Sequence, residues 1–153
     1  MRLLILVLAA AFSSTSLGAR PQRGSATAPV VSQPLGTREA IESTYWRLKT
    51  LGDGEARFTR NPREPHLTFQ PAGSVSGADG CNTLRGPYRL DREALSIGPL
   101  MMGTLMACPG LDRLDRRFLD ALGATRKWKA SASELTLLDA KDQPLAVFEA
   151  AHP

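Results

Sequence analysis

The sequence predicts an α+β domain in which a curved or barrel-like antiparallel sheet carries one packed helix. Short segments of alternating polar and apolar residues follow one another from residue 45 to residue 148, separated by turn-rich stretches. A single segment, residues 111–122, instead has apolar residues at helical spacing. One helix within a series of strands is typical of an α+β architecture.

The beginning of the chain has the pattern of an export signal. Met1-Arg2 is basic, residues 3–12 form an uncharged apolar run, and residues 13–19 are small or polar. We therefore expect residues 1–19 to be a signal peptide that is cleaved near Gly18 or Ala19. The apolar run is too short to span a bilayer comfortably. The mature protein is expected to be periplasmic or secreted, with no membrane span.

The next segment has the composition of a linker. Residues 20–36 are rich in Pro, Ser, Ala and Gly and show no sustained hydrophobic period. Such a segment buries too little apolar area to offset the entropy lost on ordering, so we expect a disordered linker. Residues 37–153 then form one domain of ordinary size.

The strands of this domain are predicted from alternation and from the turn residues between them. Leu67 and Phe69, for example, share one face of their segment. Turns are expected at 52–54, 71–73 and 139–144, where Gly, Pro, Asp and Asn gather. The expected strands are 45–51, 66–70, 83–90, 94–97, 125–131, 134–138 and 145–148, and residues 73–77 are expected to form a turn.

The predicted helix follows Pro109-Gly110. Its apolar stripe consists of Leu111, Leu114, Phe118, Leu119 and Leu122. Asp115 lies in the first turns, where a carboxylate interacts favourably with the helix dipole. Gly123 follows the stripe directly, which predicts a left-handed C-terminal cap at this glycine.

Charge and metal-ligand spacing argue against several functions. The net charge is +4, and the basic residues are spread among Asp and Glu rather than gathered in a stripe. We therefore expect no nucleic-acid partner. The two cysteines are 27 positions apart and His66 and His152 lie far from each other, a pattern that matches no zinc site. No metal or other cofactor is expected.

Cys81 and Cys108 are the only cysteines. In an exported protein the expected use of such a pair is one structural disulfide, here joining a Gly-rich turn to the segment before the helix. The alternative is a small periplasmic thiol-dependent enzyme or redox protein that uses Cys108. A position just before a helix lowers the pKa of a thiol and activates it as a nucleophile.

Methionines are concentrated in one segment. Met101, Met102 and Met106 are three of the four methionines, and the fourth is Met1. Flexible Met side chains recur where a protein grips varied apolar partners, and a groove at a barrel mouth would suit a lipid or an apolar peptide. The other interpretation, which the gap-filling ability of Met side chains favours, is an interior strand or turn that fills the core beneath the helix. The sequence leaves both interpretations open.

Several short motifs together resemble one known family. In order, the motif residues are Trp46, Gly80-Cys81-Asn82, Gly86-x-Tyr88 and Thr104-x-x-Ala107-Cys108. Over roughly residues 44–149 the chain resembles the META domain family, the HslJ-like heat-shock proteins of bacterial envelopes. The joint occurrence of Gly-Cys-Asn and Thr-x-x-Ala-Cys is the strongest part of this resemblance. Leu105 departs from the family pattern, which has an arginine after the threonine.

The resemblance implies an antiparallel, partly open barrel with a helix. It also implies an association with envelope stress, antibiotic tolerance or secretion, without an established catalytic activity. We therefore expect a non-catalytic, exported, monomeric META-domain protein. Its partner in the envelope is not identified by the sequence. A lipid or an apolar peptide is the expected ligand if the methionines line a groove.

Overall fold

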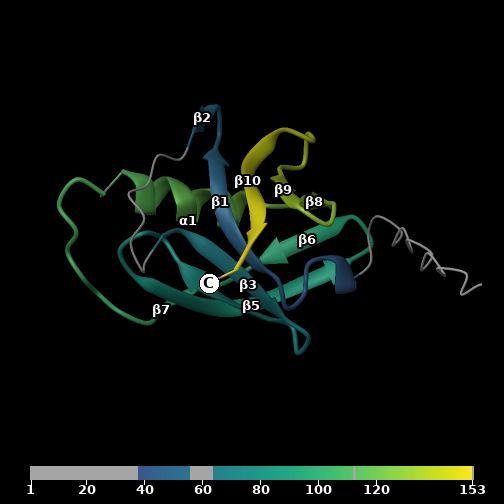
Figure 1. Ribbon diagram of the computed structural model, residues 1–153, viewed down its shortest axis with the longest axis horizontal. Helices are drawn as coiled ribbons and strands as arrows, with labels where there is room; N and C mark the ends of the chain where they lie inside the picture. The colour runs from purple at the N-terminus through teal and green to yellow at the C-terminus, as the bar shows by residue number, and fades with distance from the viewer. Residues whose placement is uncertain (1–37, 56–63, 112, 153) are drawn as a thin grey trace, which may run out of the picture. The chain divides into compact units, whose positions relative to one another are not determined.

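The computed structural model describes residues 38–55, 64–111 and 113–152 (Figure 1). The expected signal peptide (1–19) and linker (20–36) lie outside these residues. Within the described ranges, no helix is both long and apolar enough to cross a membrane.

All seven expected strands are present, and three more are added. Two of these are short, and the third, Ser74–Ala78, shows that the turn expected at 73–77 is wrong. The elements are the 3-10 helix η1 (Arg38–Ala40), β1 (Tyr45–Leu51), β2 (Gly54–Glu55), β3 (His66–Gln70), β4 (Ser74–Ala78), β5 (Thr83–Asp91), β6 (Ala94–Ile97), β7 (Met101–Met102), α1 (Leu114–Ala124), β8 (Lys127–Ala130), β9 (Glu134–Leu138) and β10 (Pro144–Ala151). The predicted α+β class with one helix is confirmed for the described residues.

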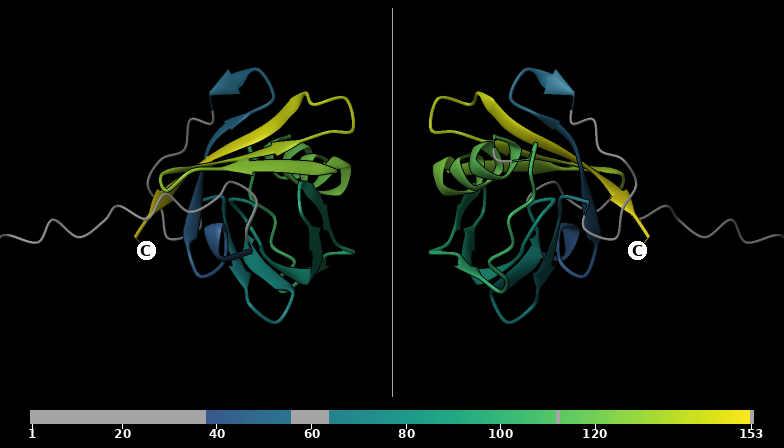
Figure 2. Two further views of the ribbon diagram at one scale, coloured as in Figure 1. Left: turned by 90° about the vertical axis from the view of Figure 1, so that its right-hand side faces the viewer. Right: turned by 90° about the vertical axis from the view of Figure 1, so that its left-hand side faces the viewer.

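The strands form a closed barrel. Antiparallel neighbours run in the order β10-β9-β8-β6-β5-β4-β3-β1, and β1 also pairs with β10, from Tyr45↔Ala151 to Leu51↔Ala146. Figure 2 shows these strands wrapped around a common interior. The expectation of a partly open barrel is therefore wrong. The first and last strands of the domain pair over almost their full lengths, which satisfies the edges that an open sheet would expose.

The narrowest seam of the barrel lies between β6 and β8. One residue pair, Ala94↔Lys127, is in register there. Two flanking backbone bonds hold the seam, from Leu95 N to Arg126 O (3.0 Å) and from Trp128 N to Glu93 O (3.2 Å). The barrel is thus closed but weakly paired at this point.

The barrel interior is filled by apolar side chains. Alternate residues of each strand face inward, as period-2 patterning requires, and Leu67, Phe69, Leu135 and Phe148 are fully buried. Helix α1 packs against β1, β6 and β10. Its Phe118 ring meets the Phe148 ring edge-on at 6.2 Å between centroids.

The helix differs from its predicted limits at both ends. Leu111 lies in the turn before α1, although its carbonyl already accepts from Asp115 N at 3.1 Å. The predicted left-handed cap at Gly123 is wrong, because the helix continues to Ala124. The buried Thr125 instead ends it, with an extended backbone and a hydroxyl that donates to Ala121 O at 2.9 Å.

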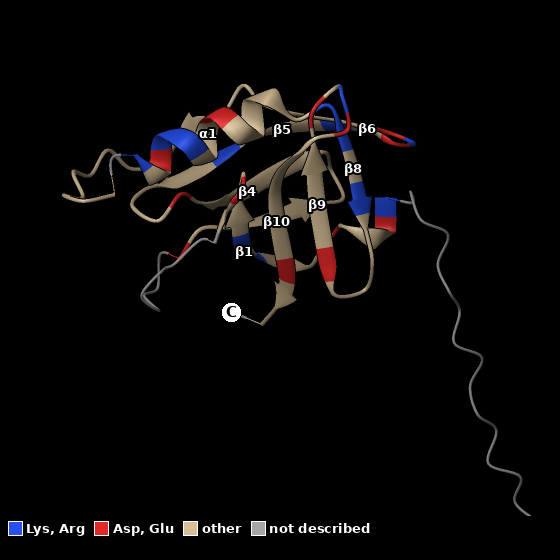
Figure 3. Cartoon of the chain, turned by 90° about the horizontal axis from the view of Figure 1, so that it is seen from above, with Lys and Arg blue, Asp and Glu red and all other residues tan. Residues whose placement is uncertain are grey.

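Charged residues lie on the outer surface of the barrel. Figure 3 shows acidic and basic positions together on α1, basic positions on β8 and acidic positions on β9 and β10. Arg47 pairs with Glu149 at 2.6 Å, and Lys49 pairs with Glu134 at 3.1 Å. The first pair joins the adjacent strands β1 and β10, and the second reaches from β1 to β9. Ion pairs near the surface contribute little to stability individually.

Candidate functional site

The Gly-Cys-Asn motif forms the hairpin turn between β4 and β5. The buried Asp79 accepts hydrogen bonds at Oδ1 from Cys81 N (2.8 Å) and Asn82 N (2.6 Å). Gly80 has φ 103°, a left-handed conformation that favours glycine. The Gly-rich turn expected at Cys81 is present, and the Asp79 side chain stabilises it.

Asn82 fastens this turn to the segment that follows β7. Its Oδ1 accepts from Met106 N at 2.7 Å and from the Thr104 hydroxyl at 3.0 Å. Its Nδ2 donates to Met106 O at 3.4 Å. Thr104 Oγ1 in turn accepts from Thr83 N at 3.1 Å. The two family motifs are therefore the two halves of one hydrogen-bonded clamp.

The clamp is completed by the Cys81–Cys108 disulfide, whose Cα atoms are 5.8 Å apart. The predicted disulfide is confirmed. The alternative of a thiol-dependent enzyme requires a free Cys108 thiolate, because the thiolate is the nucleophile. Neither cysteine of the chain is free in this structure.

Replacing Asn82 should loosen the clamp. Asn82→Ala removes three hydrogen bonds to Thr104 and Met106 and is expected to cost about 1–3 kcal/mol. Hydrogen exchange of the Met106 amide should accelerate accordingly. Gln143→Ala, which truncates an exposed amide, is the control and should change stability by less than about 0.5 kcal/mol. Unchanged exchange at Met106 in the Asn82 variant would contradict this account.

The remaining motif residues have structural contacts. Trp46 is buried and its Nε1 donates to Ile41 O at 2.9 Å. A Cβ on Gly86 would lie 2.7 Å from Pro99 O, so only glycine allows that backbone approach. Tyr88 is buried, and its hydroxyl hydrogen-bonds to Glu42 Oε1 at 2.6 Å.

The two tyrosines of the chain, Tyr45 and Tyr88, are not poised for proton transfer at neutral pH. Burial, followed by the hydrogen bond to Glu42, raises the pKa of Tyr88 to about 12. Burial, followed by the charge of Glu64, raises the pKa of Tyr45 to about 12. A general base works best with a pKa near the operating pH. Among the described residues, no group of three or more His, Cys, Asp and Glu could hold a metal ion.

One part of the methionine segment fits the core interpretation, and the other part fits the groove interpretation. Met102 packs against the hydrophobic core, as the core interpretation requires. Met101 is 67% exposed and Met106 is 43% exposed, and Leu105 between them is 92% exposed. Ala107 is also exposed on the same loop. We call residues 101–106 the apolar segment.

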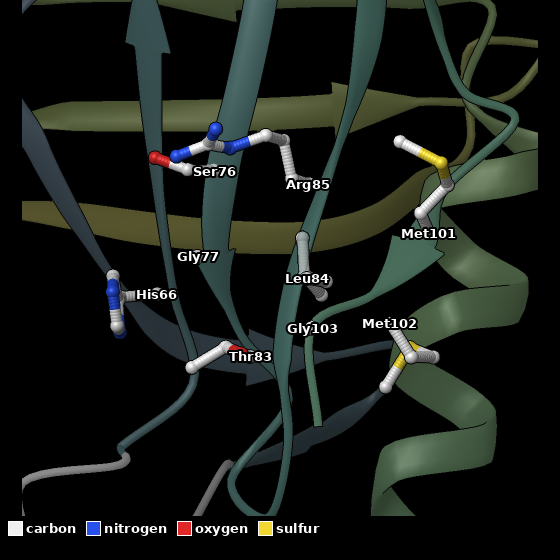
Figure 4. A pocket seen from close by; sticks show the side chains of 9 residues that line it. All are labelled: His66, Ser76, Gly77, Thr83, Leu84, Arg85, Met101, Met102 and Gly103. Carbon is white, nitrogen blue, oxygen red and sulfur yellow. The ribbon is translucent and has the colours of Figure 1, made fainter. Parts of the chain in front are cut away.

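Beside the apolar segment lies a hollow of about 570 Å³ on the strands β3, β4, β5 and β7, shown in Figure 4. Its lining includes His66, Ser76, Thr83, Leu84, Arg85 and Met101. Apart from Met101, these residues were not expected to form a site. Alternation in 83–90 places Arg85 on the outer face, but only the strand register brings it beside Ser76 and Met101.

The closed antiparallel barrel, its packed helix and the disulfide-tied clamp define a small β-barrel domain with one helix. The family comparison is more specific, because the sequence model of the META domain matches residues 39–152. The chain belongs to the META domain family, as its motifs indicated.

Solved structures share the fold. A protein from Burkholderia xenovorans, solved by NMR, is 25% identical, with a TM-score of 0.58 over 74% of this chain and 86% of that one. A second NMR structure is 24% identical, with a TM-score of 0.58 over 74% of this chain and 94% of that one. A DUF4847 family protein from Bacteroides vulgatus ATCC 8482 is 15% identical, with a TM-score of 0.55 over 72% and 94%. No curated protein matches the sequence.

Proposed function

We propose that this META domain is a non-catalytic binding module of the cell envelope that contacts an apolar peptide or lipid through its apolar segment. The observation that carries the proposal is the position of the exposed apolar side chains. Every large apolar side chain that is exposed among the described residues (Met101, Leu105 and Met106) lies in this one segment. Exposed apolar residues that gather in one place mark interaction sites more often than scattered ones do.

The clamp supports the proposal because it holds the segment in place. Asn82 binds both backbone polar groups of Met106, and the disulfide anchors Cys108 two residues later. A partner would therefore meet side chains that are already positioned, which lowers the entropy lost on binding. Leu105, which occupies the arginine position of the family pattern, makes the segment more apolar in this chain.

Export and a role in envelope stress, antibiotic tolerance or secretion belong to the same proposal. The disulfide supports export, since such bonds persist in oxidising compartments. The pattern of residues 1–19 supports it independently, as a cleavable signal would carry the domain to the envelope.

Binding of a neutral apolar dye, Nile red, tests the proposal. The native protein should bind the dye, and Leu105→Asp should weaken binding about tenfold, because a charge replaces apolar area that the dye covers. Leu105 is 92% exposed, so its replacement should not affect folding. Ala132→Asp, which adds the same charge in the exposed β8–β9 turn, is the matched control. Absence of dye binding, or equal losses in the two variants, would refute the proposal.

A further inference from the structure

The hollow beside the apolar segment arises from one cross-strand row on the outer face of the barrel. Register places Ser76 opposite Arg85 and Arg85 opposite Met101. A neighbouring row contains the small residues Thr83 and Gly103, whose backbones are joined by a 2.8 Å hydrogen bond from Gly103 N to Thr83 O. Small residues next to larger ones leave the space of about 570 Å³, which lies in the usual range for ligand pockets.

The charge in this hollow is uncompensated. Arg85 is exposed, and no ion pair within the described part of the chain involves it. The lining contains no Asp or Glu. Figure 4 shows the Arg85 guanidinium extending toward Ser76, so its donors and a hydroxyl lie together at one end of the hollow. A planar guanidinium of this kind binds a carboxylate through paired hydrogen bonds.

The other walls are apolar or fixed in orientation. Met101 supplies an exposed thioether chain directly across the strand pair from Arg85. His66 is held in place on the opposite side of the hollow. Its Nδ1 donates a hydrogen bond to Glu64 O at 2.8 Å, because a carbonyl oxygen can only accept. Its ring stacks on the Tyr45 ring, with 4.4 Å between the ring centroids. The hollow thus combines one unpaired cation with an apolar wall.

We propose that this hollow binds a small amphipathic carboxylate, with the carboxylate on Arg85 and the apolar chain against Met101. The proposal rests on the proposed function only in that Met101 belongs to both surfaces. The end of the hollow that contains Arg85 and Ser76 would select a ligand with an anionic head on an apolar chain. A neutral apolar molecule would leave the Arg85 charge without a partner.

The test compares decanoate with decanamide, which has the same chain and a neutral head, on the mature disulfide-bonded protein by calorimetric titration. Decanoate should bind at least about tenfold more tightly than decanamide, and Arg85→Met, which keeps an apolar stem, should abolish this difference. Arg89→Met is the matched control: Arg89 is exposed on the same face of β5, about 13 Å further along, and should leave both affinities unchanged.

Three outcomes would overturn the anion site: no decanoate binding, equal binding of decanoate and decanamide to the native protein, or equal losses in the Arg85 and Arg89 variants. These outcomes are separable from failure of the proposed function. That function is tested with a neutral dye and Leu105→Asp, neither of which involves the charge of Arg85.

Discussion

Reduction of the Cys81–Cys108 disulfide is expected to lower the melting midpoint by about 10 °C. The cysteines are 27 positions apart, and closing a loop of this size restricts the unfolded chain by an amount worth about 3.5 kcal/mol in the chain-entropy model. The total stability of such a domain is about 5–15 kcal/mol, so the bond supplies a substantial share. Thermal unfolding followed by circular dichroism, with and without reductant, measures the shift.

The double variant Cys81→Ser with Cys108→Ser supplies the control for this experiment. It should melt as the reduced protein does, and reductant should not shift it further. The clamp bonds from Asn82 to Met106 remain in both proteins, so the segment should stay folded at low temperature. Equal melting midpoints for the oxidised and reduced native protein would show that the disulfide does not stabilise the fold.

The strands could be predicted because their signals are local. Alternation in β1, β3 and β5 follows directly from one buried and one exposed face, and the burial patterns reproduce it. Closure of the barrel could not be predicted in this way. It depends on β1 pairing with β10, a contact between segments about 100 residues apart that no local pattern records. The end of α1 was missed because tertiary burial of Thr125 overrides the cap preference of Gly123.

The site was predictable only in part, for the same reason. The cysteines and the Gly-Cys-Asn turn carry their own signals in the sequence. The hydrogen bonds from Asn82 to Met106 depend on how the 101–106 segment returns to the turn, which spacing alone does not fix. Arg85 likewise resembles any outward-facing residue of a strand until register places it between Ser76 and Met101.

Gly77→Ala is expected to destabilise the barrel by about 3 kcal/mol, because its β4 strand runs unusually close to β3. A Cβ at this position would overlap the carbonyl oxygen of His66 and would lie 3.2 Å from the Cα of Leu67. Both neighbours are backbone atoms of β3, so no side-chain rotation can relieve the overlap. The two strands must separate, which weakens the pairing of Leu67 with Gly77 that the closed barrel contains.

Gly123→Ala is the matched control, since it makes the same chemical change at an open site. Nothing lies within 4 Å of a Cβ added there, and the residue belongs to α1. Alanine is favoured over glycine in a helix, so this variant should gain about 0.5–1 kcal/mol. Urea unfolding of both variants beside the native protein gives the two free energies. If Gly77→Ala were as stable as the native protein, β4 would not lie so close to β3 that a Cβ at residue 77 is excluded.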